Sequence, residues 1–351
     1  MEVLDRDHVA THGRDNKLHI WSLAPTRDSA STHVNTVSQA GPSIKHPQLP
    51  STMIKSLPQP TAIFTMDVNA LNYCRFSIRK EIRSSRPTLL VAVPHTLESA
   101  YIDVYQVFPD TGMFTRIAEA IGRPDLATNS ALKQSREAIT MAIHLLRTND
   151  SDDGLALLAA YEDGSVALWR NESGTSPTWR EAWRIKHHIE TVLSLSVDAR
   201  EKFAVSTGAD DFLVRYQLDV QSTEQATGRV KSSTNGGRAS GAIRSDGRIF
   251  ATGGWDGRIR CHGCESLEQL AVLDFFKDTV QSIAFSPDLR EPELESGEGK
   301  EADADAETED EDDVWDIDAE ERMQEAFQYI AAGSKDGRIA LYNINFNRDD
   351  G

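Results

Sequence analysis

The chain has 351 residues, of which 39% are hydrophobic and 26% charged, a balance typical of proteins that bury a sizeable core. No stretch approaches the roughly 18 consecutive apolar residues of a membrane span, and the opening MEVLDRDHVA lacks the basic and apolar regions of a secretory signal. Residues 291–321 hold 17 acidic side chains and one Lys, so most of the net charge of −18 lies there and the rest of the chain carries no basic footprint for nucleic acid.

Six segments along the chain share one pattern: an apolar run, small residues, a polar turn, alternating apolar residues and an aromatic side chain. They are residues 8–23, 89–107, 157–171, 203–218, 249–264 and 329–344. In five copies the turn Asp lies six residues before the aromatic-type position, and these residues are Asp15, Asp163, Asp210, Asp256 and Asp336. The aromatic positions hold Trp21, Trp169, Tyr216 and Tyr342, with His262 in the fifth copy. The second copy keeps Tyr105 but has Ser99 in place of the Asp.

Each copy reads as a β-hairpin, because β-branched and aromatic runs flank an Asp-containing tight turn. The turn Asp can accept backbone N–H groups, and the aromatic side chain can fill the space between neighbouring units. Further strand candidates lie before and after most hairpins, which gives four strands per unit. The aromatic positions 169, 216 and 262 are 47 and 46 residues apart, close to the roughly 40–45 residues of a propeller blade.

The sequence therefore predicts an all-β chain forming one β-propeller over residues 1–351, with four-stranded blades and six visible repeats, and the repeated pattern resembles WD repeats. Residues 24–60 are rich in Pro, Ser and Thr and predict a mobile insertion around one strand, and residues 108–137 predict a polar loop. Residues 289–327 predict an acidic, disordered insertion in the last blade. The first copy begins at the second strand of a blade, so we expect its innermost strand to be missing. Closing the ring then needs two strands, which gives six blades, or two strands and a whole further blade, which gives seven. We favour a seven-bladed family fold with an incomplete N-terminus.

Several non-consensus phrases carry a closer resemblance. They are THGRDNKLHIWSL, LNYCRFS, VPHTLES at 93–99, IRSDGRIFATGGWDGRIR and IAAGSKDGRIALYNI. Together, over essentially the whole chain, they resemble the fungal ASTRA-associated WD-repeat protein family, whose animal relative is a guanine nucleotide-binding protein β-subunit-like protein.

The resemblance implies a nuclear, non-catalytic scaffold subunit of an ASTRA-type complex concerned with chromatin remodelling and the maturation of large phosphatidylinositol-3-kinase-related kinases. It implies protein partners: a large kinase-like scaffold, kinase-maturation cochaperones and AAA+ ATPases. No membrane or direct nucleic-acid partner is expected. A second hypothesis, from a different class, is a propeller that directly reads histone tails or phosphopeptides.

Cys261 and Cys264 form a C-x-x-C pair around His262, which suggests zinc or redox chemistry. A structural zinc site needs four ligands, and no second such pair occurs, so strand positions in the fifth repeat are the favoured interpretation. With Cys74 they make three cysteines, too few for a disulfide framework, which favours a reducing intracellular compartment. We expect no metal and no cofactor.

The five turn carboxylates could be interpreted as a catalytic set, but one at a fixed place in each repeat is better explained by turn chemistry. His187 and His188 precede a first strand, where WD repeats commonly place a histidine that bonds within the blade. No phosphate-cradling G-x-x-x-x-G-K-[ST] and no G-x-S-x-G occurs. The sequence therefore predicts no enzyme.

Two features are candidates for partner binding. The acidic tract at 301–321 could bind a basic partner such as a histone tail, with Trp315 and Ile317 as apolar anchors and Thr308 as an acid-directed phosphosite. The second feature is a set of turn residues, namely Arg14, Lys17, His95, Glu98, Trp255, Arg258, Lys335 and Arg338. Among these Trp255, an aromatic residue near an Arg, has the composition of an interface hot spot.

Overall fold

The computed structural model describes residues 1–5, 7–23, 60–69, 74–81, 88–123, 138–147, 154–172, 178–218, 227–231, 236–286 and 329–344. All regular structure in these residues is β-strand, from β1 to β23, and they contain no helix that could cross a membrane. The strands fall into two compact units, Met1–Ile185 and Lys186–Gly351, and each unit holds three antiparallel sheets.

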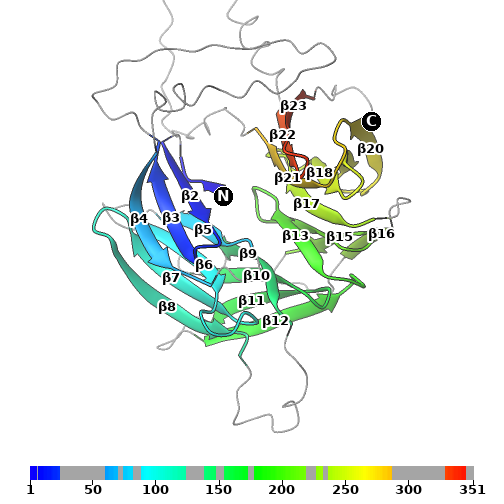
Figure 1. Ribbon diagram of the computed structural model, residues 1–351. Coiled ribbons are helices and arrows are strands. Elements are labelled where there is room, and N and C mark those ends of the chain that lie inside the picture. Colours follow the sequence, from blue (N-terminus) through cyan, green and yellow to red (C-terminus); the bar gives the residue numbers. More distant parts are fainter. Residues whose placement is uncertain are drawn as a thin grey trace, which may run out of the picture. The chain divides into compact units, whose positions relative to one another are not determined.

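In the first unit every sheet follows chain order or its reverse (Figure 1). The first sheet contains β1 (Glu2–Val3), β2 (His8–His12), β3 (Lys17–Ser22) and β4 (Thr61–Asp67). The second contains β5 (Ser77–Glu81), β6 (Thr88–Pro94), β7 (Ile102–Phe108) and β8 (Met113–Ile121). The third contains β9 (Thr140–Arg147), β10 (Leu155–Tyr161), β11 (Ser165–Glu172) and β12 (Thr178–Lys186).

The second unit repeats this plan. The fourth sheet contains β13 (Val192–Val197), β14 (Phe203–Gly208), β15 (Phe212–Gln217) and β16 (Thr227–Lys231). The fifth contains β17 (Arg238–Ile243), β18 (Ile249–Gly254), β19 (Arg258–Gly263) and β20 (Gln269–Asp274). The sixth contains β21 (Val280–Phe285), β22 (Tyr329–Ser334) and β23 (Ile339–Asn343), so three of its strands lie in the described part of the chain.

The second strands of most sheets read as continuous apolar or small runs, such as LALLAAY in β10 and IFATGG in β18. Both strands are buried along their whole length, and a strand buried on both faces reads as a near-continuous apolar run. The outer strand β12, by contrast, is mostly exposed and carries charged side chains. This layering is the physical reason for the apolar run that opens each repeat.

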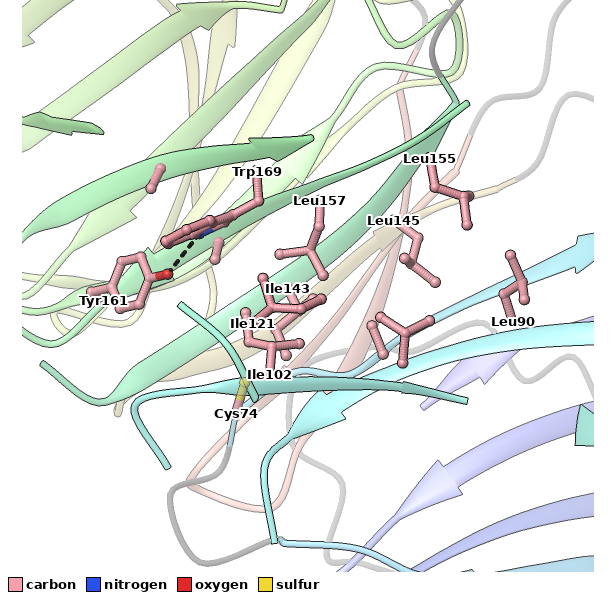
Figure 2. Packing of buried hydrophobic residues seen from close by; sticks show 14 residues of the cluster. Cys74, Leu90, Ile102, Ile121, Ile143, Leu145, Leu155, Leu157, Tyr161 and Trp169 are labelled. Atoms are coloured by element: carbon pink, nitrogen blue, oxygen red, sulfur yellow. Dashed lines mark hydrogen bonds between the residues drawn. The ribbon is translucent and has the colours of Figure 1, made fainter. Parts of the chain in front are cut away.

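The first unit has one cluster of buried side chains between its first and second sheets and another between its second and third sheets, and Figure 2 shows the latter. Leu90 and Ile102 pack with Leu157 in one cluster of buried side chains, and the cluster extends to Trp169. The Trp169 indole N–H donates a hydrogen bond of 3.0 Å to the Tyr161 hydroxyl, so this large side chain is buried without an unpaired polar atom.

In the second unit the fifth sheet packs on the sixth in the same way. Ile259 and Cys261 of β19 are fully buried in a cluster with Val280 and Ile330. The corresponding positions of β23, Ile339 and Leu341, are exposed, and β23 is an edge strand among the described residues. The same two positions are therefore buried in the fifth sheet, which packs on the sixth, and exposed in the sixth sheet.

The backbone conformation of the tight turns explains why Gly or Asn follows the turn Asp in most repeats. The residue after the turn Asp has a positive φ at Asn16 (58°), Gly164 (87°), Gly257 (78°) and Gly337 (80°), where Gly and Asn are favoured. Position 257 also has no room for a side chain, since a Cβ there would lie 2.5 Å from the carbonyl oxygen of Phe276.

The all-β class and the four-stranded units are confirmed, but two expectations about strands were wrong. The first sheet does have an innermost strand, because Glu2 and Val3 pair with Ala10 and Val9. The segment expected as a polar loop from residue 108 contains the strand β8, whose sequence MFTRIAEAI is exposed at most positions and buried only at its end. β4, directly after the Pro-rich insertion, was not anticipated.

The insertions at 24–60 and 289–327 lie outside the described residues except for Pro60. Single-domain organisation over 1–351 and a seven-bladed family fold remain predictions.

Candidate functional site

The five turn carboxylates all hold their own turns. Each accepts a hydrogen bond from the backbone N–H two residues later, and the N···O distances lie between 3.0 and 3.2 Å. The residues are Asp15, Asp163, Asp210, Asp256 and Asp336. The structure therefore places them one per sheet, each bonded within its own turn.

In the fourth sheet the turn residue Asp210 belongs to a buried hydrogen-bond network. His188 Nδ1 donates to Asp210 at 2.8 Å, and its Nε2 lies 2.7 Å from the hydroxyl of Ser206, which in turn contacts the Tyr216 hydroxyl at 3.1 Å. Burial would raise the pKa of Asp210, but the hydrogen bonds from His188 and the Ile189 amide prevail and lower it to about 2. His188 is 2% exposed and fully engaged, so it ties a loop to the sheet and is not placed as a general base.

The fifth sheet holds its turn differently. Arg260 grips Asp256 through two hydrogen bonds of 3.1 and 2.6 Å, and this pairing lowers the pKa of the Asp256 carboxyl. Arg238, also buried, lies close enough to act electrostatically on Arg260 and on His262. His262 is 2% exposed at the aromatic position, and burial together with the Arg238 charge lowers its pKa to about 4 despite a smaller opposing effect of the Leu267 backbone.

The C-x-x-C pair lies in the apolar core. Cys261 packs with Ile259, and Cys264 belongs to a cluster with Phe203. Burial raises the pKa of the Cys261 thiol to about 11 and that of Cys264 to about 12, so both are protonated at neutral pH. Among the described residues no group of three or more His, Cys, Asp or Glu side chains could hold a metal ion.

His95, a candidate for partner binding, is instead buried. It is 4% exposed, and its Nδ1 donates to Asp103, a carboxylate with no exposed surface, at 2.9 Å. Asn69 donates a hydrogen bond to the His95 carbonyl, and the nearby Glu98 is exposed and paired with Arg123 at 3.3 Å. The phrase VPHTLES therefore encodes an anchored loop, and placing His95 at a partner surface was wrong because its ring is needed inside the sheet.

The aromatic positions differ in burial. Tyr216 and Trp169 are buried, whereas Trp21, Tyr105 and Tyr342 are half-buried. The Trp21 indole N–H donates to the Thr11 hydroxyl at 2.7 Å, and the Tyr105 hydroxyl donates to Asp103 at 3.2 Å.

The remaining partner candidates divide between the two units. Arg14 is exposed and Lys17 is paired with Asp67 at 2.8 Å, both at the turn of the first sheet. In the second unit Trp255 is 46% exposed and stands at the turn of the fifth sheet with Arg258. Lys335 and Arg338 stand at the corresponding turn of the sixth sheet.

Four residues that the structure shows to be part of buried pairs or of an exposed surface were not predicted from the sequence. Asp103 lies between Ile102 and Val104, and Arg260 between Ile259 and Cys261, and a charge between apolar strand neighbours signals a buried, paired group. Phe275 and Lys277 lie in the loop after β20 and carry no such signal, because single exposed residues in a loop follow no period.

Comparisons with known proteins agree with this fold. Residues 240–262 match the WD domain, G-beta repeat. In crystal structures, Chaetomium thermophilum Sqt1 is similar at a TM-score of 0.51 and 16% identity, over 95% of this chain and 64% of that one. Sqt1 bound to the N-terminus of the ribosomal protein L10 is similar at a TM-score of 0.51 and 17% identity, over 96% of this chain and 67% of that one. Together with the four-stranded sheets, these similarities show a WD-repeat β-propeller fold.

Curated relatives are similar over nearly the whole chain. ASTRA-associated protein 1 of Verticillium alfalfae is 32% identical over 348 residues, covering 96% of this chain and 77% of the relative. The Aspergillus niger protein of the same name is 26% identical, covering 96% and 81%. The mouse guanine nucleotide-binding protein subunit beta-like protein 1 is 31% identical over 65% of this chain and 63% of its own length. On this evidence the chain belongs to the ASTRA-associated protein 1 family.

Proposed function

We propose that this chain is a non-enzymatic WD-repeat scaffold associated with the ASTRA complex. The observation that carries the proposal is its family membership, which rests on similarity along 96% of the chain and so extends well beyond the repeat consensus. In finer detail, we propose a nuclear subunit that serves chromatin remodelling and the maturation of large phosphatidylinositol-3-kinase-related kinases. Its partners are a kinase-like scaffold, kinase-maturation cochaperones and AAA+ ATPases.

The chemistry of the described residues supports a binding role. The turn carboxylates and His188 are occupied by hydrogen bonds inside their sheets, and the buried thiols are protonated. The side chains that face solvent at the turns are of the kinds that contact other proteins, including Trp255 and Arg258. A similar propeller, Sqt1, has been crystallised with a peptide from another protein, which supports peptide docking as a use of this fold.

The experiment is affinity purification of the tagged full chain from its own cells, followed by quantitative mass spectrometry. We expect enrichment of the kinase-like scaffold, the cochaperones and the AAA+ ATPases over a tagged, unrelated WD-repeat protein. Equal recovery from both baits would refute the scaffold role. A fluorescent fusion should concentrate in the nucleus, and a uniformly cytoplasmic signal would contradict that part of the proposal.

The acidic tract, which lies outside the described residues, adds a separable proposal: it binds a basic partner such as a histone tail. Deleting residues 291–321 should weaken histone recovery and leave the complex subunits bound. Unchanged histone recovery would reject this contribution alone.

A further inference from the structure

One end of the second unit carries a cluster of aromatic and cationic side chains that we name the aromatic–basic surface. It consists of Trp255, Arg258, Phe275, Lys277 and Lys335, which are exposed, and Arg338, which is half-buried. Trp255 is 46% and Phe275 50% exposed, although such rings usually bury most of their area in an isolated domain.

The three segments that contribute these residues are joined by short contacts. The loop after β20 lies against the turn of the fifth sheet, since a Cβ on Gly257 would lie 2.5 Å from the Phe276 carbonyl. On its other side the Lys277 amide donates to Asp336 at 3.1 Å, and the Lys335 amide donates to the Thr279 carbonyl at 2.9 Å. The surface is therefore continuous across the fifth and sixth sheets.

Both aromatic rings are held in place. The Trp255 amide donates to the Gly237 carbonyl at 3.0 Å, and the ring lies over Gly237, where a Cβ would meet it at 2.9 Å. The Arg338 guanidinium lies 5.7 Å from the centre of the Phe275 ring. Rings fixed before binding lose little conformational freedom when a partner covers them, which favours tight contact.

On this surface the carboxylates are engaged in contacts within the fold, whereas two of the cations are not. Asp256 is gripped by Arg260, and Asp336 is occupied by the backbone amides of Lys277 and Arg338. Asp274 remains 63% exposed and pairs with Arg258 at 3.1 Å. The ammonium groups of Lys277 and Lys335 are exposed and form no ion pair with another described side chain. The ammonium groups of these two lysines therefore remain available to a partner.

We propose that the aromatic–basic surface docks an acidic segment of a partner protein, whose apolar side chains pack on Trp255 and Phe275 while its carboxylates meet Lys277 and Lys335. This deepens the proposed function, on which it rests, by naming the surface and the chemistry of the docked segment. The rings supply contact area, and the lysines select negative charge.

The probe is a phage-displayed library of random peptides about 12 residues long, selected on the full chain, followed by synthesis of the enriched peptides. We expect Asp and Glu to be enriched around one or two apolar residues. Trp255→Ala with Phe275→Ala should weaken their binding about 30-fold or more. Lys277→Gln with Lys335→Gln should weaken it about tenfold at low salt and less at high salt. The matched control is Leu97→Ala, an 85% exposed residue in the loop between β6 and β7, which should change binding less than about twofold.

Thermal melting of each variant checks folding, and little change is expected because all substituted side chains are exposed. Enriched peptides without acidic residues, peptides that bind the aromatic variant as well as the wild type, or no enrichment at all would overturn the inference. These results leave the scaffold function standing if the wild-type chain still recovers the complex subunits. Conversely, selective acidic-peptide binding with no recovery of those subunits would refute the scaffold function alone.

Discussion

Replacing the buried His262 by Phe should make the second unit markedly less sensitive to acid. The wild-type ring lies at the position that Trp169 and Tyr216 occupy in other sheets, and it is 2% exposed beside Arg238. A phenyl ring fits the same aromatic role and cannot take up a proton. At neutral pH we expect a stability close to that of the wild type.

The magnitude follows from the pKa of His262, which is lowered from 6.5 to about 4 by burial and by Arg238. As the pH falls through 6.5 the unfolded histidine binds a proton while the folded one does not, so the unfolded state gains stability down to pH 4. One pKa unit corresponds to about 1.4 kcal/mol, which gives a loss of about 3 kcal/mol between pH 7 and pH 4. Asp210, with a pKa of about 2, loses its stabilising charge only below this window.

Urea unfolding followed by intrinsic fluorescence at pH 7, 6, 5 and 4 measures the difference between wild type and variant. Other titrating groups are common to both proteins and cancel. The control Phe250→Leu alters the residue paired with His262 in the sheet and should lower stability equally at every pH. Parallel profiles for wild type and His262→Phe would refute the reasoning, because they would mean that the folded protein protonates this ring as readily as the unfolded chain.

Three further predictions concern the turns and the core. Gly257→Ala should cost about 2 kcal/mol, because it adds a clash to a positive φ of 78°, whereas Gly112→Ala, at φ 67° with open space, should cost about 1 kcal/mol by the same urea titration. His188→Ala should cost about 3 kcal/mol by leaving Asp210 charged and buried, and adding Asp210→Asn should restore part of that loss. Cys261, with a pKa near 11, and the other buried cysteines should react with a chromogenic disulfide reagent at pH 8 only after unfolding; a thiol titrated in the native state would contradict their burial.

The hairpins that recur in each sheet could be predicted from the sequence, whereas strands without a repeated pattern could not. The spacing from Asp256 to His262 is a local period that recurs in five copies, so the hairpins and their turns could be identified from it. β8 could not be recognised, because MFTRIAEAI is exposed on most positions and shows no clean alternation of apolar and polar residues. The innermost strand β1 has two residues, too few to show any period.

The candidate partner-binding residues were likewise predicted only where a local pattern determines their exposure. The expectation that Trp255 is exposed at a turn agrees with the structure, since turn position is set by the local pattern. His95 lies in a similar turn context and yet is buried, because its partner Asp103 comes from the neighbouring strand. A pairing across strands depends on register, which residue type alone does not reveal.

The turns of these sheets are stabilised by Asp carboxylates, and the partner of the carboxylate differs from sheet to sheet. A turn carboxylate meets a histidine 22 residues earlier in the fourth sheet and an arginine four residues later in the fifth. In the second sheet the carboxylate moves into the strand as Asp103 and meets His95. Burying a carboxylate is costly without a cation or several donors, so each sheet must provide a partner, but the partner can come from any segment that reaches the turn. The fifth sheet supplies its cation from within the hairpin, through Arg260, while Trp255 at the same turn stays 46% exposed.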